Sequence, residues 1–263
     1  MNLKQKTKIM MVGIVAFFIL SSDVMANSIG IGIGRTTEYP GSGDYGILPN
    51  AAFELDTPLG KLKNNQIGVQ LDIIRNDNID TGPILRANFG RSDTVSDTAV
   101  AALEEVSPGA EFGWFVNSGV KLSSLGIPSD VILIGRLDAV TDVGDGHGGT
   151  LVSGSLGLVF QLTEKFRLVP SVGFNYGDDN YTDAFYSVSS TGAAASGLEE
   201  FSASGGLVYT QVALYGVRTI DERWSVAGTV AYNSLEGDAS DSPITQSGTN
   251  KQLFTGFVVN YAF

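Results

Sequence analysis

The sequence of 263 residues lacks cysteine and contains a single histidine, His147. The absence of cysteine excludes a disulfide framework and thiol chemistry. Charged residues are scarce, at 17% of the chain, and beyond the N-terminal region no apolar run approaches the roughly 20 residues that a membrane-spanning helix needs. Acidic residues outnumber basic ones by 28 to 16, and a surface of that sign repels nucleic acid, so we exclude nucleic acid as a partner.

The N-terminus carries the features of a secretory signal peptide. Three lysines within the first eight residues supply positive charge, residues 9–20 form an uncharged apolar segment, and small residues lead up to Ala26. The alternative is a retained anchor helix, but twelve apolar residues are short for spanning a bilayer. We therefore predict cleavage after Ala26 and a single mature domain, residues 27–263. That domain would carry 13 basic and 27 acidic residues, a net charge of −14.

An exported protein without a second hydrophobic helix is either soluble or a β-barrel in an outer membrane. The 33 glycines, the 10% of aromatic residues and the low charge favour the barrel. Residues 223–233, RWSVAGTVAYN, alternate larger apolar residues with small or polar ones, and place Trp224 and Tyr232 near the two ends, where the membrane interfaces would lie. The same period of two recurs in residues 28–34, 66–73, 109–120, 130–139 and 166–176.

The connections between these segments also alternate in character. Residues 123–129, 162–166 and 220–223 are short turns, whereas residues 92–109, 141–149, 177–206 and 235–251 are long and polar. Short turns facing the periplasm and long loops facing outward are typical of outer-membrane barrels. Within the first long loop, residues 98–106 predict one or two helical turns.

The number of strands follows from the same pattern. Counting back from Phe263 gives eight strands, and the N-terminal part supplies four more if Asn64 and Asn65 form a tight turn. We predict an all-β transmembrane antiparallel barrel of about 12 strands, with about 10 or 14 as alternatives. Such a barrel closes when its last strand pairs with its first. Phe263 and Tyr261 lie on the lipid-facing side of the last strand, and a terminal phenylalanine resembles the signal that outer-membrane barrels present to their assembly machinery.

The alternation also predicts six charged side chains inside the barrel. They are Asp72, Arg86, Glu111, Arg136, Asp138 and Arg167. Charges in a narrow lumen are costly unless they are paired, so we expect a salt-bridge network that braces a mostly closed interior. The alternative is a selectivity constriction in a channel for small solutes. A barrel of about 12 strands is much narrower than open porins of about 16–18 strands, which favours bracing.

His147 stands in the glycine-rich segment DVGDGHGGT. A hydrolytic role would pair it with Asp142, Asp145 or a distant serine, but the sequence shows no nucleophile or orienting group. The aspartates lack the ligand order of a calcium loop. We interpret the segment as a shaped loop and predict no catalytic residue, cofactor or metal site. The acidic residues of the long loops either share divalent cations with anionic lipopolysaccharide or keep the loops soluble.

Several segments together resemble the MltA-interacting protein family (MipA/OmpV) of outer-membrane proteins, in order and spacing, over essentially the whole mature chain. The segments are EYPGSGDYGILP (38–49), GPILRANFGR (82–91), VSPGAEFGWF (106–115), GDGHGGTLVSGSLGLVFQL (144–162), DAFYSVS (183–189), GDASDSPIT (237–245) and the final YAF. At position 43 the family pattern leads us to expect a second acidic residue, but this sequence has Gly43 there.

This resemblance implies an outer-membrane location and a non-enzymatic scaffold, which holds a lytic transglycosylase near a bifunctional murein synthase. Relatives are also described as outer-membrane antigens or porin-like proteins, so a narrow diffusion channel for small solutes is the alternative function. A barrel of this kind also meets outer-membrane lipid, lipopolysaccharide and the barrel assembly machinery.

Overall fold

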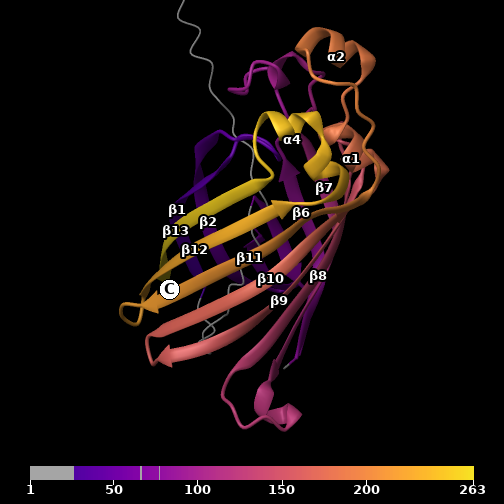
Figure 1. Ribbon diagram of the computed structural model, residues 1–263. Coiled ribbons are helices and arrows are strands. Elements are labelled where there is room, and N and C mark those ends of the chain that lie inside the picture. Colours follow the sequence, from indigo (N-terminus) through magenta and orange to yellow (C-terminus); the bar gives the residue numbers. More distant parts are fainter. Residues whose placement is uncertain (1–26, 66, 77) are drawn as a thin grey trace, which may run out of the picture.

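The computed structural model describes residues 27–263 apart from residues 66 and 77, and its strands form a closed antiparallel barrel (Figure 1). The predicted signal peptide lies outside the described residues. β4 and β5 both pair with β6 and act as one strand, so the barrel has 12 strands, as predicted. The strand segments are β1 (Ser28–Thr37), β2 (Tyr45–Thr57), β3 (Gly60–Asn65), β4 (Gly68–Asp72), β5 (Ile74–Arg75), β6 (Ile79–Asn88), β7 (Gly109–Lys121), β8 (Ile132–Asp142), β9 (Thr150–Thr163), β10 (Phe166–Gly177), β11 (Gly206–Thr219), β12 (Trp224–Leu235) and β13 (Lys251–Ala262).

Closure of the barrel joins the two ends of the described chain. β13 pairs with β1 from Ser28 opposite Ala262 to Arg35 opposite Thr255, as the alternation at the C-terminus predicts. The N–H of Phe263 donates to the carbonyl of Asn27 at 2.8 Å and extends this seam by one bond. Pairing the last strand with the first removes the two sheet edges that an open sheet would expose.

The break between β4 and β5 has a local cause in β6. The N–H of Ile73 donates to the carbonyl of Thr81 at 3.1 Å, and the N–H of Ala87 donates to the carbonyl of Ile67 at 3.4 Å. Odd-numbered residues of β6 therefore turn their backbone groups toward β4 and β5. Pro83 shares this direction but has no N–H to donate, so the ladder is interrupted beside it.

The hairpin of β3 and β4 corrects the predicted tight turn at Asn64 and Asn65. Asn64 pairs with Val69 and Asn65 pairs with Gly68, so both asparagines belong to β3 and the chain reverses after them. Asn64 is held in the strand because its Oδ1 accepts the N–H of Phe53 on β2 at 2.9 Å.

Short helices lie in the connections. They are η1 (Val100–Ala102), η2 (Leu122–Leu125), α1 (Asp179–Tyr186), α2 (Ser190–Ser196), α3 (Gly237–Asp241) and α4 (Pro243–Ser247). The helical turns predicted over residues 98–106 reduce to η1, because Leu103 is already extended. Among the residues described, no helix is long and apolar enough to cross a membrane.

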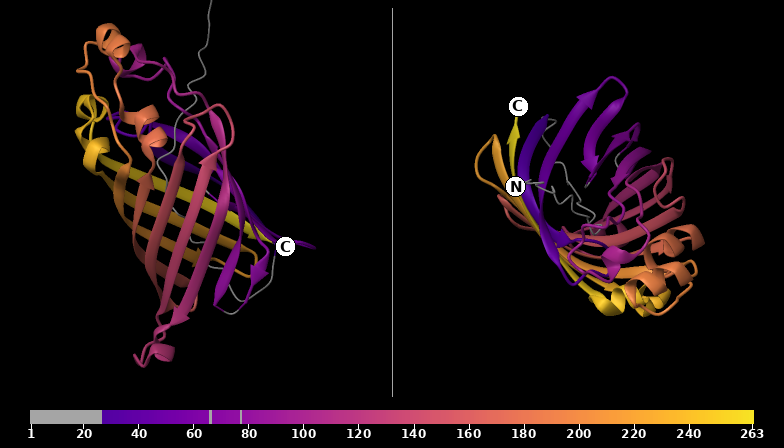
Figure 2. Two further views of the ribbon diagram at one scale, coloured as in Figure 1. Left: turned by 90° about the vertical axis from the view of Figure 1, so that its right-hand side faces the viewer. Right: turned by 90° about the horizontal axis from the view of Figure 1, so that it is seen from above.

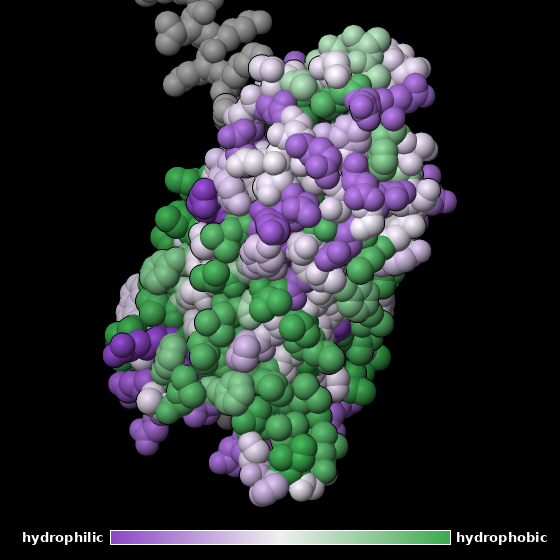
Figure 3. Space-filling model, in the orientation of Figure 1, coloured by the Kyte–Doolittle hydropathy of each residue, from purple (hydrophilic) through white to green (hydrophobic). Residues whose placement is uncertain are grey.

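The outer surface of the barrel is apolar on the strands. Ile31 of β1, Leu137 of β8 and Val212 of β11 are among many large apolar side chains that are exposed. Figure 3 shows such residues as a green belt over the strands, beneath a more polar cap formed by the loops. Apolar side chains gathered on the outer face of the strands fit contact with lipid.

The loops at the end opposite the short turns pack against one another (Figure 2). Tyr39, Phe185, Tyr186 and Ile244 come from three different connections and share one buried cluster with Phe115 of β7. Burial raises the pKa of the Tyr186 hydroxyl well above its ordinary value. The cluster also contains inward-facing residues of β6, β8 and β9, namely Ile84, Val140 and Leu151. Loop side chains therefore fill the upper lumen beside these strands.

Candidate functional site in the barrel lumen

Glu111 is the centre of one set of buried polar contacts. It faces Arg86 directly across the β6–β7 pair, and the Nε of Arg86 lies 2.6 Å from its Oε2. Its Oε1 accepts from Nδ2 of Asn88 at 2.9 Å and lies 3.0 Å from Nε2 of His147. Because opposite residues of an antiparallel pair share one face, the register alone places the Arg86 and Glu111 side chains together.

Arg136 of β8 is the centre of a second set. Its Nε donates to Asp138 at 2.7 Å, two residues along the same face, and its Nη1 donates to Gln70 and Asn117 at 3.0 Å each. Nη1 of Arg86 lies 3.8 Å from Asp138, which joins the two sets. The contact to Gln70 links β8 with β4 and so ties together strands that are not neighbours in the sheet.

A third set lies on the β3–β4 hairpin. Lys63 pairs with Asp72 at 2.7 Å, and Lys61 pairs with Glu54 of β2. Of these, only Asp72 was among the predicted lumen residues. The alternation of lysine and leucine in residues 61–63 carries the signal, but it spans too few residues to assign a face without the pairing to β2.

The charges of these three sets balance. Four acidic and four basic residues take part, all with nearly buried side chains: Glu54, Asp72, Glu111, Asp138, Lys61, Lys63, Arg86 and Arg136. Each charge has an opposite partner, which offsets the cost of removing it from water.

Arg167, the sixth predicted residue, lies apart from these sets. It stands near the end of β10 that carries the short turns, and its Nε donates to Gln161 of β9 at 3.2 Å. Strand alternation assigns the inward face but not the height along the barrel, which depends on the register of all the strands.

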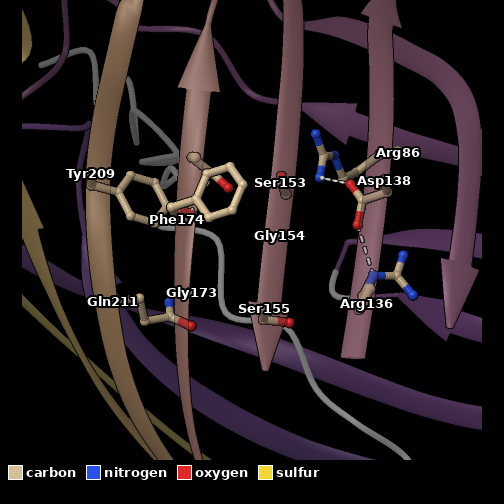
Figure 4. Close-up of a pocket in the computed structure, with 11 residues that line it drawn as sticks. Arg86, Arg136, Asp138, Ser153, Gly154, Ser155, Gly173, Phe174, Tyr209 and Gln211 are labelled. Atoms are coloured by element: carbon tan, nitrogen blue, oxygen red, sulfur yellow. Dashed lines mark hydrogen bonds and ion pairs between the residues drawn. The ribbon is translucent and has the colours of Figure 1, made fainter. Parts of the chain in front are cut away.

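A cavity borders the charged residues. Figure 4 shows Arg86, Asp138 and Arg136 on one side of it and Tyr209 and Gln211 on the other. The space between these residues is about 360 Å³ when the solvent at its open side is included. The Nη2 atoms of Arg86 and Arg136 are buried there without a hydrogen-bond partner among the described residues. These two donors are enclosed by neighbouring side chains and are closed off from solvent.

His147 shapes a loop. Its Nδ1 accepts the N–H of Gly149 at 3.1 Å, so the proton of the neutral ring lies on Nε2, which faces Glu111. Asp142 accepts the N–H groups of Gly144 and Gly148 at 2.9 and 2.8 Å and closes the same loop. These contacts hold the loop against Glu111 of β7. Within the described part of the chain, no cluster of three or more metal-ligating side chains occurs.

Comparison with known proteins agrees with this architecture. The sequence model of the family described as MltA-interacting protein MipA matches residues 29–263. The chain belongs to this family. It is also similar to YiaT of Escherichia coli K12, which is named as an outer-membrane protein, with 27% identity over 122 residues, 46% of this chain and 48% of YiaT. The match thus spans about half of that relative.

The fold has a counterpart among solved structures. The NanC porin superposes with a TM-score of 0.51 and 10% sequence identity, and the match covers 89% of this chain and all of the porin. At that identity the likeness concerns the fold alone. Fold, family and relative together identify an outer-membrane β-barrel, as predicted from the sequence.

Proposed function

We propose that this barrel is a non-enzymatic scaffold, which holds a lytic transglycosylase and a bifunctional murein synthase at the periplasmic end. The family description supports the proposal, because it names an interaction with MltA. In outer-membrane barrels the end with short turns faces the periplasm, where such enzymes work.

One connection at that end carries the proposal. Residues 122–131 join β7 to β8 and include η2, whereas the neighbouring connections between β9 and β10 and between β11 and β12 span only residues 164–165 and 220–223. Figure 1 shows the β7–β8 connection projecting below the other turns. Leu125 and Ile127 in it are 58% and 51% exposed. An exposed apolar projection fits a docking site for a protein partner.

The connection is held by its own hydrogen bonds. The N–H of Leu122 donates to Val131 at 2.9 Å, and the N–H of Ile127 donates to Leu122 at 3.1 Å. Such a preformed segment loses less conformational entropy on binding than a mobile loop. Ten residues are nevertheless less than a typical interface of about 800 Å² per partner, so the partner would also contact neighbouring turns.

The experiment is capture of the two murein enzymes by the tagged barrel after brief crosslinking in cells. The double substitution Leu125→Asp and Ile127→Asp should reduce capture at least about tenfold, because charges replace the apolar contact. Leu59→Asp is the matched control, since Leu59 is 75% exposed in the β2–β3 turn. Equal capture by both variants, or none by the unaltered barrel, would contradict the scaffold.

A narrow diffusion channel is a second candidate, and the cavity beside Arg86 and Arg136 favours it. A channel would show conductance that responds to these arginines, whereas a scaffold requires none. The two functions are compatible, because a channel would use the lumen and the scaffold would use the periplasmic turns.

Two further interactions are proposed for the same barrel. Phe263 and Tyr261 would be read by the barrel assembly machinery, and both lie at the periplasmic end of β13, where Tyr261 packs on Trp224 with ring centroids 4.9 Å apart. The acidic loops at the other end would share divalent cations with lipopolysaccharide.

A further inference from the structure

The single histidine of the chain is enclosed beneath the extracellular loops. The side chain of His147 is fully buried, and its ring packs against two rings of α1, with centroids 5.0 Å from Tyr181 and 5.8 Å from Phe185. On the lumen side its Nε2 lies 3.0 Å from Glu111 of β7. The ring therefore joins the polar contacts of the lumen to the loop cluster above them.

The hydrogen bonds of this ring fit only its neutral form. Nδ1 of His147 accepts the N–H of Gly149 at 3.1 Å, while Nε2 faces Glu111. A protonated imidazole carries a hydrogen on both nitrogens and accepts no hydrogen bond. Protonation therefore sets the new N–H of Nδ1 against the N–H of Gly149, and that backbone group loses its acceptor.

The charged groups around the ring are already engaged. Glu111 pairs with Arg86 at 2.6 Å, within sets whose charges balance. The carboxylates of Asp142 and Asp178 each accept two backbone N–H groups, and Asp142 is partly exposed, so solvent screens it. Burial raises the pKa of the Tyr181 hydroxyl, so this neighbour stays neutral. A buried imidazolium would add a positive charge that nothing around it fully balances, which is costly.

The segment that carries His147, residues 143–149, is bonded to α1. Oδ2 of Asp178, which caps α1, accepts the N–H of Thr150 at 2.8 Å directly after this segment. Nδ2 of Asn180 donates to the carbonyl of Gly148 at 3.2 Å. Together with the ring contacts, these bonds mean that displacement of the segment removes support from α1.

We propose that protonation of His147 releases residues 143–149 and α1 from the upper lumen, so that these two segments act as a lid that opens at acid pH. Histidine is the side chain whose ordinary pKa lies between about pH 5 and 8, whereas carboxylates stay ionised over most of that range. The closed arrangement needs the neutral ring, so it is favoured at the upper end of the range and lost as the pH falls. The lid is independent of the scaffold, which uses the periplasmic turns.

Hydrogen exchange of the purified barrel in lipid nanodiscs tests the release, with rates at about pH 7.5 and about pH 5 corrected for intrinsic exchange. Amides of residues 143–149 and 179–186 should exchange at least about fivefold faster at the lower pH. Residues 225–233 of β12, which is paired on both sides, are the internal reference and should not change. Hydroxyl-radical footprinting should show a matching rise at Tyr209, a lumen-facing side chain of β11 that is 8% exposed.

Two variants assign the response to the ring. His147→Gln cannot be protonated, so its exchange should be the same at the two pH values. Glu104→Gln is the matched control, because Glu104 is a titratable loop residue that bonds to Ser189 and has no printed contact with the ring in the described chain. It should respond to pH as the unaltered barrel does. Heat-modified migration on gels confirms that each variant is folded.

Because the chain has a single histidine, protonation has its own readout. NMR spectra of the barrel labelled with ¹⁵N-histidine report His147 alone. They should show the Nε2–H tautomer at about pH 7.5 and the imidazolium at lower pH, with a midpoint that matches the change in exchange.

Three results would overturn the proposal. The first is a ring that becomes protonated while exchange and footprinting stay unchanged, which would show that the closed loop accommodates the imidazolium. The second is a ring that stays neutral down to about pH 5. The third is an equal pH response in His147→Gln, which would assign the release to carboxylates.

Discussion

The two sides of the lumen wall are built in opposite ways. From β3 to β8 the inward positions carry long charged side chains that bond to one another across strands, with Glu111 and Arg136 at the centres. From β11 through β13 to β1 the inward positions carry mainly small or apolar residues. Ala231 packs against Phe254 there, and Gly32 of β1 lies opposite Val258 of β13. Different strands therefore brace the lumen and close the barrel.

The small-residue side permits closure. A Cβ on Gly32 would lie 2.0 Å from the carbonyl oxygen of Phe257, so only glycine fits where β1 approaches β13. The charged side also has close glycine contacts, because a Cβ on Gly113 would lie 1.8 Å from the carbonyl oxygen of Ala139, but there long side chains occupy the lumen as well. Substitutions on the two sides should therefore destabilise the barrel for different reasons.

The largest effect is expected for Glu111→Gln on the charged side. The change removes the nearer counter-charge of buried Arg86 and leaves only Asp138, 3.8 Å from its Nη1, which costs about 3–5 kcal/mol. Urea unfolding of the barrel in lipid vesicles measures the loss. The double variant Glu111→Leu with Arg86→Met should recover most of it, and a loss below about 1 kcal/mol in the single variant would refute the bracing role.

The closing seam gives the next largest effect. Gly32→Ala should destabilise the barrel by about 1–3 kcal/mol, because backbone must move to admit the methyl group. Gly228→Ala is the control, since its Cβ would meet only the carbonyl of Gly256 at 3.8 Å. Similar unfolding free energies for the two variants would show that the seam has more room than the structure indicates.

Conductance compares the two sides directly. Arg136→Ala removes bonds to Asp138, Gln70 and Asn117 and leaves Asp138 facing the cavity. We expect single-channel conductance to rise about twofold with a shift toward cations. Asn233→Ala, on the small-residue side, should change neither quantity. Unchanged conductance in Arg136→Ala would place the constriction elsewhere.

The smallest effect lies outside both walls, in the extracellular loops. The Ser189 hydroxyl donates to Glu104 at 2.6 Å and lowers the pKa of that carboxyl. Its contribution to stability is present above the ordinary carboxyl pKa and is lost as the pH falls through the lowered pKa. Ser189→Ala should raise the Glu104 pKa, which an NMR titration of its side chain measures, and an unaltered titration would exclude the bond.

Much of the fold could be predicted from the sequence because a barrel repeats one simple rule. Period-two alternation gives the inward face of Arg86, Glu111 and Arg136 without knowledge of any partner. It could not assign β11, where the register against β10 shifts between Asn175 and Tyr176. A bulge of this kind moves side chains from one face to the other.

The candidate site was harder to predict because it depends on register and loops. The contact of His147 with Glu111 joins residues 36 positions apart through a loop whose path no local pattern gives. The unpaired upper edge of β2 depends on the short length of β3 relative to β2. Asn64 and Asn65 belong to β3 and not to its turn, which no local pattern in the sequence indicates.

The most direct test of the proposed scaffold is photo-crosslinking in living cells from a photoreactive amino acid at position 125. If the β7–β8 connection is the docking site, products with a lytic transglycosylase or a murein synthase should form from position 125 and be at least about tenfold weaker from position 59 in the β2–β3 turn. Equal products from the two positions, or products with neither enzyme while the barrel is folded, would contradict the scaffold.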